Sequence, residues 1–406
     1  MNCRVIFILP ILLATIGHAA TPALLIGPDL KPREVKLQAV SAGKLSYFDD
    51  ERRLQVESAA NVLQIRMLSV DPPADGEKPR EAPAAATTPP PKIDKPAEAP
   101  ATPAPPAVVE LIDGQRIIAR FTSTDADGQK LTFEHAALGA VAINLDRVSR
   151  LFLDGVAATK PTPAKDQVIL ANGDALEGFV AAMKKDTIEL QQDAGKSIAL
   201  PTERVKALLL ANPIVRAAQP QSVVWLRDGS RLIAEQADIE ADKLQLRAAI
   251  AGGKALSLPL TQIARLELPS RRGRLIDLAD LPMTVKAGGS VFGLPMPPRV
   301  EGGAIRLHAP VTVEFALPAG AGKLAALAEI DADGESIAWS DFAVNCSAGD
   351  AKARAALSAA QPRGELLMDL FGPTLTISLD PAANGPVMDR LRLREAMVFV
   401  QTPAGE

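Results

Sequence analysis

Apolar and polar residues alternate in short runs along most of this chain, a pattern typical of β-strands with one face in a core. Three stretches share one plan: VVELIDGQRII at 108–118, QVILANGDALE at 167–177 and VVWLRDGSRLI at 223–233. Each is a strand, an Asp-Gly or Asn-Gly turn and a second strand, which is a strong signal for a hairpin. Another alternating pair and a closing strand follow in each copy. The pattern therefore predicts tandem units of five short strands.

The first-turn glycines mark the repeat. Gly114, Gly173 and Gly229 are 59 and 56 residues apart, a spacing that indicates an internal repeat. These turns are expected to need positive φ, so the three glycines are predicted to be structural. A single open sheet this small would expose an apolar face, so each unit is expected to close into a small barrel. The units resemble the Sm-like and SH3-like small barrels.

The chain divides into seven segments. The predicted order is a signal peptide (1–20), an N-terminal β segment (21–70), a Pro/Ala-rich linker (71–106), β-barrel repeats 1, 2 and 3 (107–157, 166–212 and 221–270) and a β-sandwich (271–406). The N-terminal segment alternates like the repeats and is interpreted as a degenerate fourth copy. The linker holds twelve prolines in thirty-six positions, so it is expected to be an extended spacer that separates the N-terminal segment from the rest. This order predicts an elongated monomer.

The last segment reads as longer strands between Gly, Pro and Asp turns. Residues 305–317, 375–379 and 391–400 alternate in this way, and AKARAALSAA at 351–360 is interpreted as extended because it lies between strands. About 130 residues of such strands suit a β-sandwich with a jelly-roll or related topology. The predicted fold class is all-β.

Several landmarks in residues 271–402 recur in the order of a known family. The elements G-x-I-x-x-HAP, I-D-x-D, S-I-x-W and D-R-L-x-L-x-x-A are similar to those of the NPCBM family of carbohydrate-binding modules. The matching residues are His308, Ala309 and Pro310, Asp331 and Asp333, Trp339, Asp389 and Ala396. The resemblance implies a galactose-binding-like sandwich with Trp339 on an inward-facing strand. The sequence departs from the family at Val344–Asn345–Cys346 and lacks a tryptophan before the closing alanine.

His308, Asp331 and Asp333 are the candidate ligand-binding residues. The favoured alternative for His308 is a structural role at a strand bend, where Pro310 interrupts the backbone hydrogen bonds. Residues 331–334 have the composition of an ordinary turn, which is the favoured interpretation. The alternative is that Asp331 and Asp333 bind a calcium ion. Trp339 is expected to pack in the core rather than to stack on a sugar, and no other metal site has ligand spacing.

Charge and composition narrow the function. A net charge of −4 with mixed signs excludes an electrostatic footprint for nucleic acid, and no later segment is apolar enough for membrane insertion. The start of the chain reads as a cleaved secretory signal, which predicts a secreted or periplasmic protein. Removing it leaves a single cysteine, Cys346, so no internal disulfide is possible. His135 ends an alternating strand and is expected to face solvent.

No catalytic motif is present, so we expect a non-enzymatic protein without a cofactor. The leading hypothesis is that the sandwich recognises an extracellular polysaccharide or a glycan-bearing protein. The first alternative is a structural or assembly protein of the cell envelope that binds no sugar and uses its repeats for protein contacts. The second alternative is an accessory chain of a glycoside hydrolase.

Overall fold

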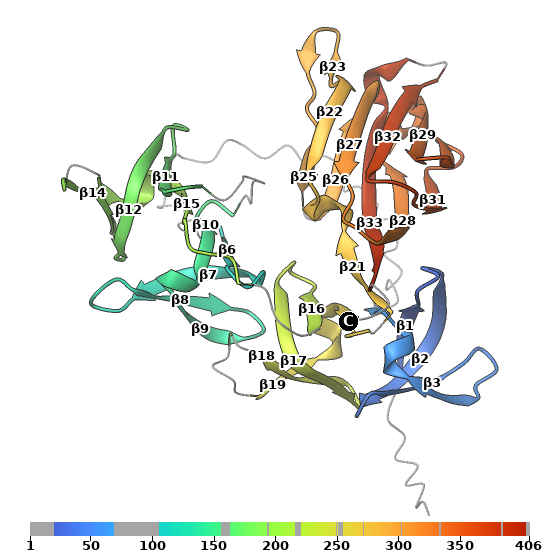
Figure 1. Cartoon of the computed structure of the whole chain (residues 1–406), viewed down its shortest axis with the longest axis horizontal. Helices are drawn as coiled ribbons and strands as arrows, with labels where there is room; N and C mark the ends of the chain where they lie inside the picture. Colours follow the sequence, from blue (N-terminus) through green and yellow to red (C-terminus); the bar gives the residue numbers. More distant parts are fainter. Residues whose placement is uncertain are drawn as a thin grey trace, which may run out of the picture.

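The computed structural model describes residues 20–68, 105–155, 163–192, 195–215, 221–248, 250, 255–270, 272–301, 303–332, 334–382 and 385–402. It is an all-β chain of four small barrels followed by a β-sandwich, which confirms the predicted fold class (Figure 1). Apart from Ala20, the signal peptide lies outside the described residues. So does the linker, apart from Pro105 and Pro106.

Each barrel has five strands. The N-terminal barrel contains β1 (Thr21–Ile26), β2 (Pro32–Ser41), β3 (Lys44–Phe48), β4 (Leu54–Ser58), η1 (Ala59–Asn61) and β5 (Gln64–Met67). Repeat 1 contains β6 (Ala107–Leu111), β7 (Arg116–Thr124), β8 (Lys130–His135), β9 (Gly139–Asn144), η2 (Leu145–Arg147) and β10 (Val148–Phe152). Repeat 2 contains β11 (Asp166–Leu170), β12 (Ala175–Met183), β13 (Thr187–Gln191), β14 (Ser197–Pro201), η3 (Thr202–Arg204) and β15 (Val205–Leu209). Repeat 3 contains β16 (Ser222–Leu226), β17 (Arg231–Glu240), β18 (Lys243–Ala248), β19 (Ala255–Pro259), η5 (Leu260–Gln262) and β20 (Ile263–Glu267).

All four barrels share one topology. The first strand pairs with both the second and the fifth, and a short 3-10 turn joins the fourth strand to the fifth. The N-terminal segment has the same strand order as the three repeats although it lacks the first-turn glycine. In the three repeats the turn glycines Gly114, Gly173 and Gly229 have φ of 86°, 93° and 93°, in the region that favours glycine.

The barrels associate in pairs through their closing strands. In repeats 1 and 2, β10 runs antiparallel to β15, with Leu151 opposite Leu208. In the N-terminal barrel and repeat 3, β5 runs antiparallel to β20, with Ile65 opposite Leu266. All four of these central side chains are fully buried. The two pairs are therefore built alike, and strand pairing joins all twenty barrel strands into one continuous sheet.

Repeats 1 and 3 meet at their first turns. The Ile118 amide donates to Ser230 Oγ at 2.9 Å, and the Ile233 amide donates to Gln115 Oε1 at 3.3 Å. Gln115 and Ser230 follow the turn glycines of their repeats, so the contact is symmetric in sequence. Both side chains are buried. The turns predicted to end hairpins thus also connect the two pairs of barrels.

His135 lies in this contact, and the expectation that it faces solvent is wrong. It is 1% exposed, and its Nε2 lies 2.9 Å from Asp228 Oδ2 in repeat 3. On β8, His135 takes the same face as the buried Leu131 and Phe133, so strand alternation itself indicates an inward position. What the sequence does not show is the partner: Asp228 and Ser230 of repeat 3 contact the ring.

The sandwich holds two antiparallel sheets. Its elements are β21 (Gly273–Asp277), η6 (Leu278–Asp280), β22 (Met283–Gly288), β23 (Ser290–Val291), β24 (Leu294–Pro295), β25 (Arg299–Glu301), β26 (Ala304–His308), β27 (Val311–Ala316), β28 (Ala321–Ile330), η7 (Gly334–Trp339), β29 (Asp341–Ala348), β30 (Ala351–Ser358), β31 (Arg363–Asp369), β32 (Thr374–Pro381), η8 (Pro386–Met388) and β33 (Arg390–Gln401). One sheet has the order β25-β26-β33-β28-β31, with β21 also paired to β33, and the other has the order β22-β27-β32-β29-β30. Residues 351–358 form a strand, as the sequence predicts.

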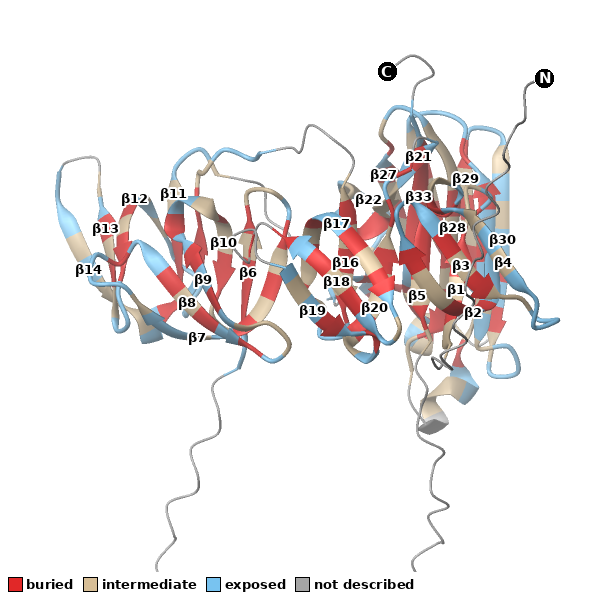
Figure 2. Ribbon diagram, turned by 90° about the horizontal axis from the view of Figure 1, so that it is seen from below, coloured by how far each residue is buried: buried red, intermediate tan, exposed pale blue. Residues whose placement is uncertain are grey.

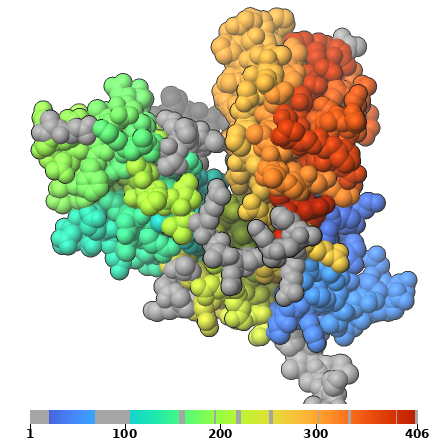
Figure 3. Space-filling view, in the orientation of Figure 1, coloured from blue at the N-terminus to red at the C-terminus, as the bar shows by residue number. Residues whose placement is uncertain are grey.

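One large cluster of buried residues runs through the barrels, a smaller one lies between repeats 1 and 2, and another runs through the sandwich (Figure 2). A further cluster joins the sandwich to the N-terminal barrel. Met397 and Phe399 on β33 pack there against Ile26, Leu30 and Leu63. Arg66 also forms an ion pair with Glu395. The sandwich therefore sits directly on the N-terminal barrel, while repeat 2 lies far from it (Figure 3).

This packing corrects one expectation about the linker. The N-terminal segment was expected to be separated from the rest of the chain, yet its closing strand pairs with repeat 3 and its surface contacts the sandwich. The pairing is between units distant in sequence, which a composition argument does not detect. The barrels form one assembly rather than a string of independent units.

Two turn glycines give a matched stability test. Gly173 and Gly229 have the same φ of 93°, but a Cβ at Gly173 would meet no atom within 4 Å, whereas one at Gly229 would lie 3.1 Å from Ile118 Cδ1 in repeat 1. We expect Gly173→Ala to destabilise its barrel by about 1–2 kcal/mol through backbone strain alone. Gly229→Ala should cost more and should also raise hydrogen exchange in repeat 1. Equal costs confined to the mutated barrel would contradict the contact between repeats 1 and 3.

Candidate binding site at the distal end of the sandwich

The two ends of the sandwich differ in their surroundings. β33 starts at Arg390, opposite His308 on β26, and the Arg390 carbonyl accepts a hydrogen bond from the Asp331 amide. Its other end carries Met397 and Phe399 into the contact with the N-terminal barrel. We call the Arg390 end the distal end. It comprises the turn after β26, the β23–β24 hairpin and the loops that contain η7 and η8.

His308 is held by carbonyl groups at this end. Its side chain is 8% exposed, with Nδ1 2.9 Å from the Ala309 oxygen and Nε2 3.2 Å from the Val387 oxygen. Carbonyls only accept hydrogen bonds, so a neutral imidazole donates to one of them at a time. The ring links the end of β26, next to Pro310, with η8. This geometry suits a residue that positions the loops.

Two polar residues that the sequence reading did not single out as site residues complete this framework. Asp389 is fully buried, and its Oδ1 accepts a hydrogen bond of 3.0 Å from the Asp341 amide. Ser340 donates from Oγ to the Met388 oxygen at 2.7 Å. The two bonds tie the η7 loop to the η8 loop. Asp389 is one of the landmarks of the family resemblance, but neither its hydrogen bond to Asp341 nor the role of Ser340 leaves a periodic signal in the sequence.

The predicted acidic residues stand apart from this framework. Asp331 Oδ2 lies 3.5 Å from Arg306 Nη1, in an ion pair on the outer face of the sheet. Asp333 lies outside the described residues. Among the residues that the structure describes, no group of three or more His, Cys, Asp or Glu side chains is suited to hold a metal ion.

Trp339 is exposed, and the expectation that it packs in the core is wrong. It is the last residue of η7 and is 66% exposed. The strand that follows begins at Asp341, and its inward aromatic is Phe342, which is 1% exposed. Phe342 therefore takes the core place that the family resemblance implied for Trp339. The indole lies on the surface, next to the contact between η7 and η8.

Other apolar side chains are exposed at the distal end. Val387 on η8 is 44% exposed, and Phe292 and Leu294 of the β23–β24 hairpin are 84% and 64% exposed. That hairpin is placed by the Gly289 amide, which donates to the Pro310 oxygen. The hairpin follows β22, at one edge of the five-stranded sheet, whereas η7 contacts β30, at the other edge, and η8. The polar framework therefore supports Trp339 and Val387, and the apolar residues of the hairpin form a separate exposed group.

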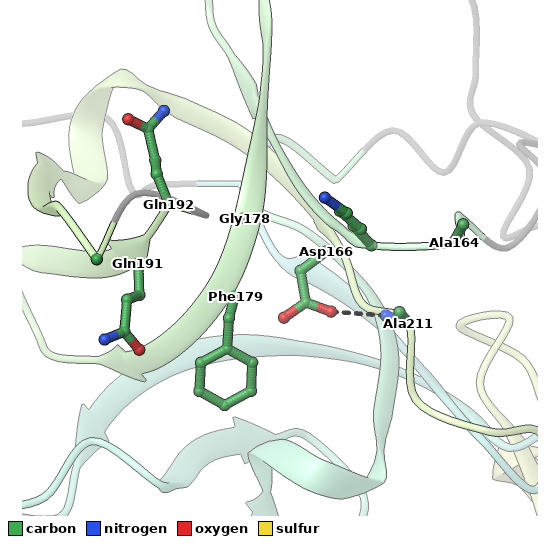
Figure 4. A pocket seen from close by; sticks show the side chains of 9 residues that line it. Ala164, Asp166, Gly178, Phe179, Gln191, Gln192 and Ala211 are labelled. Carbon is green, nitrogen blue, oxygen red and sulfur yellow. Dashed lines mark hydrogen bonds between the residues drawn. The ribbon is translucent and has the colours of Figure 1, made fainter.

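Apart from the distal end of the sandwich, a depression with a volume of about 500 Å³ lies on repeat 2 (Figure 4). Phe179 lines it and is 61% exposed. Its carboxylate, Asp166, is used by the fold: Oδ1 accepts from the Ala211 amide at 2.7 Å and Oδ2 from the Val180 amide at 2.9 Å. Gln191 and Gln192 point in different directions in the close view. The depression lacks a set of convergent polar groups.

Ser230, His135 and Asp228 form a group that superficially resembles a hydrolytic triad. Both Ser230 Oγ and Asp228 Oδ2 face the same ring nitrogen of His135, at 3.1 and 2.9 Å. Nδ1 accepts hydrogen bonds from the Ala137 and Leu138 amides. A nucleophilic triad needs the hydroxyl and the carboxylate on opposite nitrogens and an accessible hydroxyl. Ser230 is fully buried, so the group connects two barrels and is not arranged for catalysis.

Cys346 is a buried free thiol, and its burial raises the pKa of the thiol to about 12.

No helix among the described residues is both long and apolar enough to cross a membrane.

Comparisons with known proteins give limited similarity. No family model matches the chain, and no curated protein matches it. The NPCBM resemblance is therefore unsupported by a family model. Among solved structures, the chain is similar to CBM51-2 in complex with GlcNAc and INT domains from Clostridium perfringens ZmpB, at 14% identity and a TM-score of 0.26, over 43% of this chain and 42% of that one. It is also similar to the CBM22-1–CBM22-2 tandem domain from Paenibacillus barcinonensis Xyn10C, at 12% identity and a TM-score of 0.19, over 75% of this chain and 100% of that one. The chain spans less than half the length of the first of these structures.

Asp389 gives a pH-dependent test of the distal framework. Burial raises its pKa above the ordinary value of 3.8, against the Asp341 amide bond, which lowers it. A raised native pKa means that the stabilising effect of the protonated form is complete below the unfolded pKa and is lost as pH rises through the native pKa. Asp389→Asn mimics the protonated form and keeps the acceptor for the Asp341 amide. We therefore expect the difference in melting temperature, Asp389→Asn minus the natural chain, to become larger from pH 4 to pH 7. A difference that is constant with pH would contradict this account of Asp389.

Proposed function

We propose that this chain is a secreted, non-enzymatic recognition protein whose sandwich binds an extracellular glycan at the distal end. The observation that carries the proposal is Trp339, an indole that is 66% exposed on a loop held in place by the hydrogen bonds of Ser340 and Asp389. Large apolar rings on a preorganised surface lose little entropy on binding. The exposed side chain and its fixed support are the combination that a recognition site requires.

The chemistry at this end suits sugars. A sugar ring has an apolar face of C–H groups and an edge of hydroxyls. The indole face of Trp339 offers apolar contact and an N–H donor, and Val387 extends the apolar surface. Asp331 and Arg306, on the adjoining face, supply charged acceptors and donors for hydroxyl groups. Recognition then depends on the loops, while the sandwich core holds the loops in register.

A matched pair of aromatic substitutions tests the proposal. Phe371 is 59% exposed but lies at the opposite end of the sandwich, beside Gly349 and the start of β28. On a glycan array, the full chain should bind at least one sugar class. We expect Trp339→Ala to weaken that binding about tenfold or more, and Phe371→Ala to leave it unchanged. Retained binding in Trp339→Ala, or equal losses in both variants, would contradict a site at the distal end.

A second candidate function is that of a structural or assembly protein of the cell envelope without sugar binding. One observation favours it. Among the described strands, the edge strand β4 pairs with β3 alone. Its Leu54 and Val56 point outward and are 47% and 61% exposed, while Gln55 and Glu57 take the inward positions. The equivalent inward positions in repeat 1 hold Val141 and Ile143. An apolar outward face on an edge strand is suited to a protein contact.

A further inference from the structure

A row of arginines crosses the outer face of one sandwich sheet. The strand register places Arg299 opposite Arg306, Arg306 opposite Arg392, Arg392 opposite Glu329 and Glu329 opposite Arg363. Directly opposed residues lie on the same face of a sheet. The row therefore runs across all five strands β25, β26, β33, β28 and β31. We call these five residues the arginine row.

The row lies on the surface and not in the core. On β33 the neighbours Leu391 and Leu393 are fully buried and point inward, so Arg392 points outward. The side chains of Arg306 and Arg363 are 37% and 71% exposed. Further toward the barrels, the same face is covered, because Met397 and Phe399 pack on the N-terminal barrel. The row is the uncovered part of this face, next to the distal end.

The charges on this face are unevenly paired. Arg306 forms ion pairs with both Glu301 and Asp331, at 3.3 and 3.5 Å. Glu329 forms ion pairs with both Arg363 and Arg394, at 3.2 and 3.4 Å. Within the part of the chain that the structure describes, Arg299, Arg390 and Arg392 have no ion pair. Within the row and beside it, this face carries six arginines, at 299, 306, 363, 390, 392 and 394, against four carboxylates, at 301, 329, 331 and 365. Nearer the barrels, Lys323 pairs with Asp369, and Glu395 pairs with Arg66. The excess of positive charge is therefore local to the row.

The row also carries a stability cost. Like charges directly opposite each other on neighbouring strands are destabilising, and here two arginine pairs are adjacent. The Nε atoms of Arg306 and Arg392 are buried without a hydrogen-bond partner among the described residues. The ion pairs of Arg306 with Glu301 and Asp331, and the position of Glu329 opposite Arg392, offset part of this repulsion. An external anion would offset more of it.

We propose that the arginine row binds an extended acidic polysaccharide, with carboxylate or sulfate groups, laid across the strands. This inference rests on the proposed glycan-binding function and names its ligand class. Neighbouring strands are about 4.8 Å apart, so four steps give the row a length of about 19 Å. That length takes several sugar units. Guanidinium groups bind such anions in bidentate geometry.

The test is a binding titration of the full chain with dextran sulfate, polygalacturonate, neutral dextran and a single-stranded oligonucleotide. Both acidic polysaccharides should bind, more weakly as salt rises, and neutral dextran should not. We expect Arg299→Gln with Arg392→Gln to weaken binding about tenfold or more. Arg120→Gln is the matched control, because Arg120 is an exposed arginine on repeat 1. Arg363→Gln, at the exposed end of the row, gives an independent reading if the double variant does not fold.

Each outcome decides a separate claim. Unchanged binding of the acidic polysaccharides in the double variant and in Arg363→Gln overturns the arginine row as their site. An oligonucleotide that binds as tightly as the acidic polysaccharides overturns the ligand class. If binding of the acidic polysaccharides is lost in Trp339→Ala and unchanged in the row variants, the distal site stands and the row proposal fails. If the acidic polysaccharides require the row and Trp339→Ala changes nothing, the row stands and the distal site fails.

Discussion

The antiparallel pairing of β5 with β20 is the contact on which the arrangement of the whole chain depends. It joins the first barrel to the last and buries Ile65 and Leu266 completely. The Leu268 amide extends it by donating to the Leu63 oxygen at 2.9 Å. An unpaired closing strand would leave backbone groups open to other chains. Pairing within the chain satisfies those groups and brings the N-terminal barrel beneath the sandwich.

The position of the sandwich follows from this contact. Repeat 3 leads directly into β21, which pairs with β33, and β33 then buries Met397 and Phe399 on the barrel that β20 has brought into place. The covered end of the sheet is thereby fixed. The distal end and the arginine row are what remains open, so the same packing that builds the assembly decides which surfaces are available to a ligand.

Local features were predictable from the sequence and contacts between units were not. Alternation and the Asp-Gly or Asn-Gly turns are properties of neighbouring residues, so the repeats, their glycines and the strand at 351–358 follow from them. The contact of His135 with repeat 3 and the exposure of Trp339 depend on what packs on a face, which periodicity does not encode. The arginine row joins residues from 299 to 392 through strand register. The net charge of −4, summed over the whole chain, does not reveal this local cluster of arginines.

Strand pairing and the sandwich contact, rather than the covalent linker, hold the N-terminal barrel in place. A protease site inserted within residues 71–104 separates the N-terminal barrel from the remainder of the chain without touching either interface. After cleavage, size-exclusion chromatography should show the two fragments eluting together, and Leu266→Asp on β20 should release the N-terminal fragment. If the N-terminal fragment of the cleaved chain, with Leu266 unchanged, elutes alone, the linker and not the two interfaces holds the barrel in place.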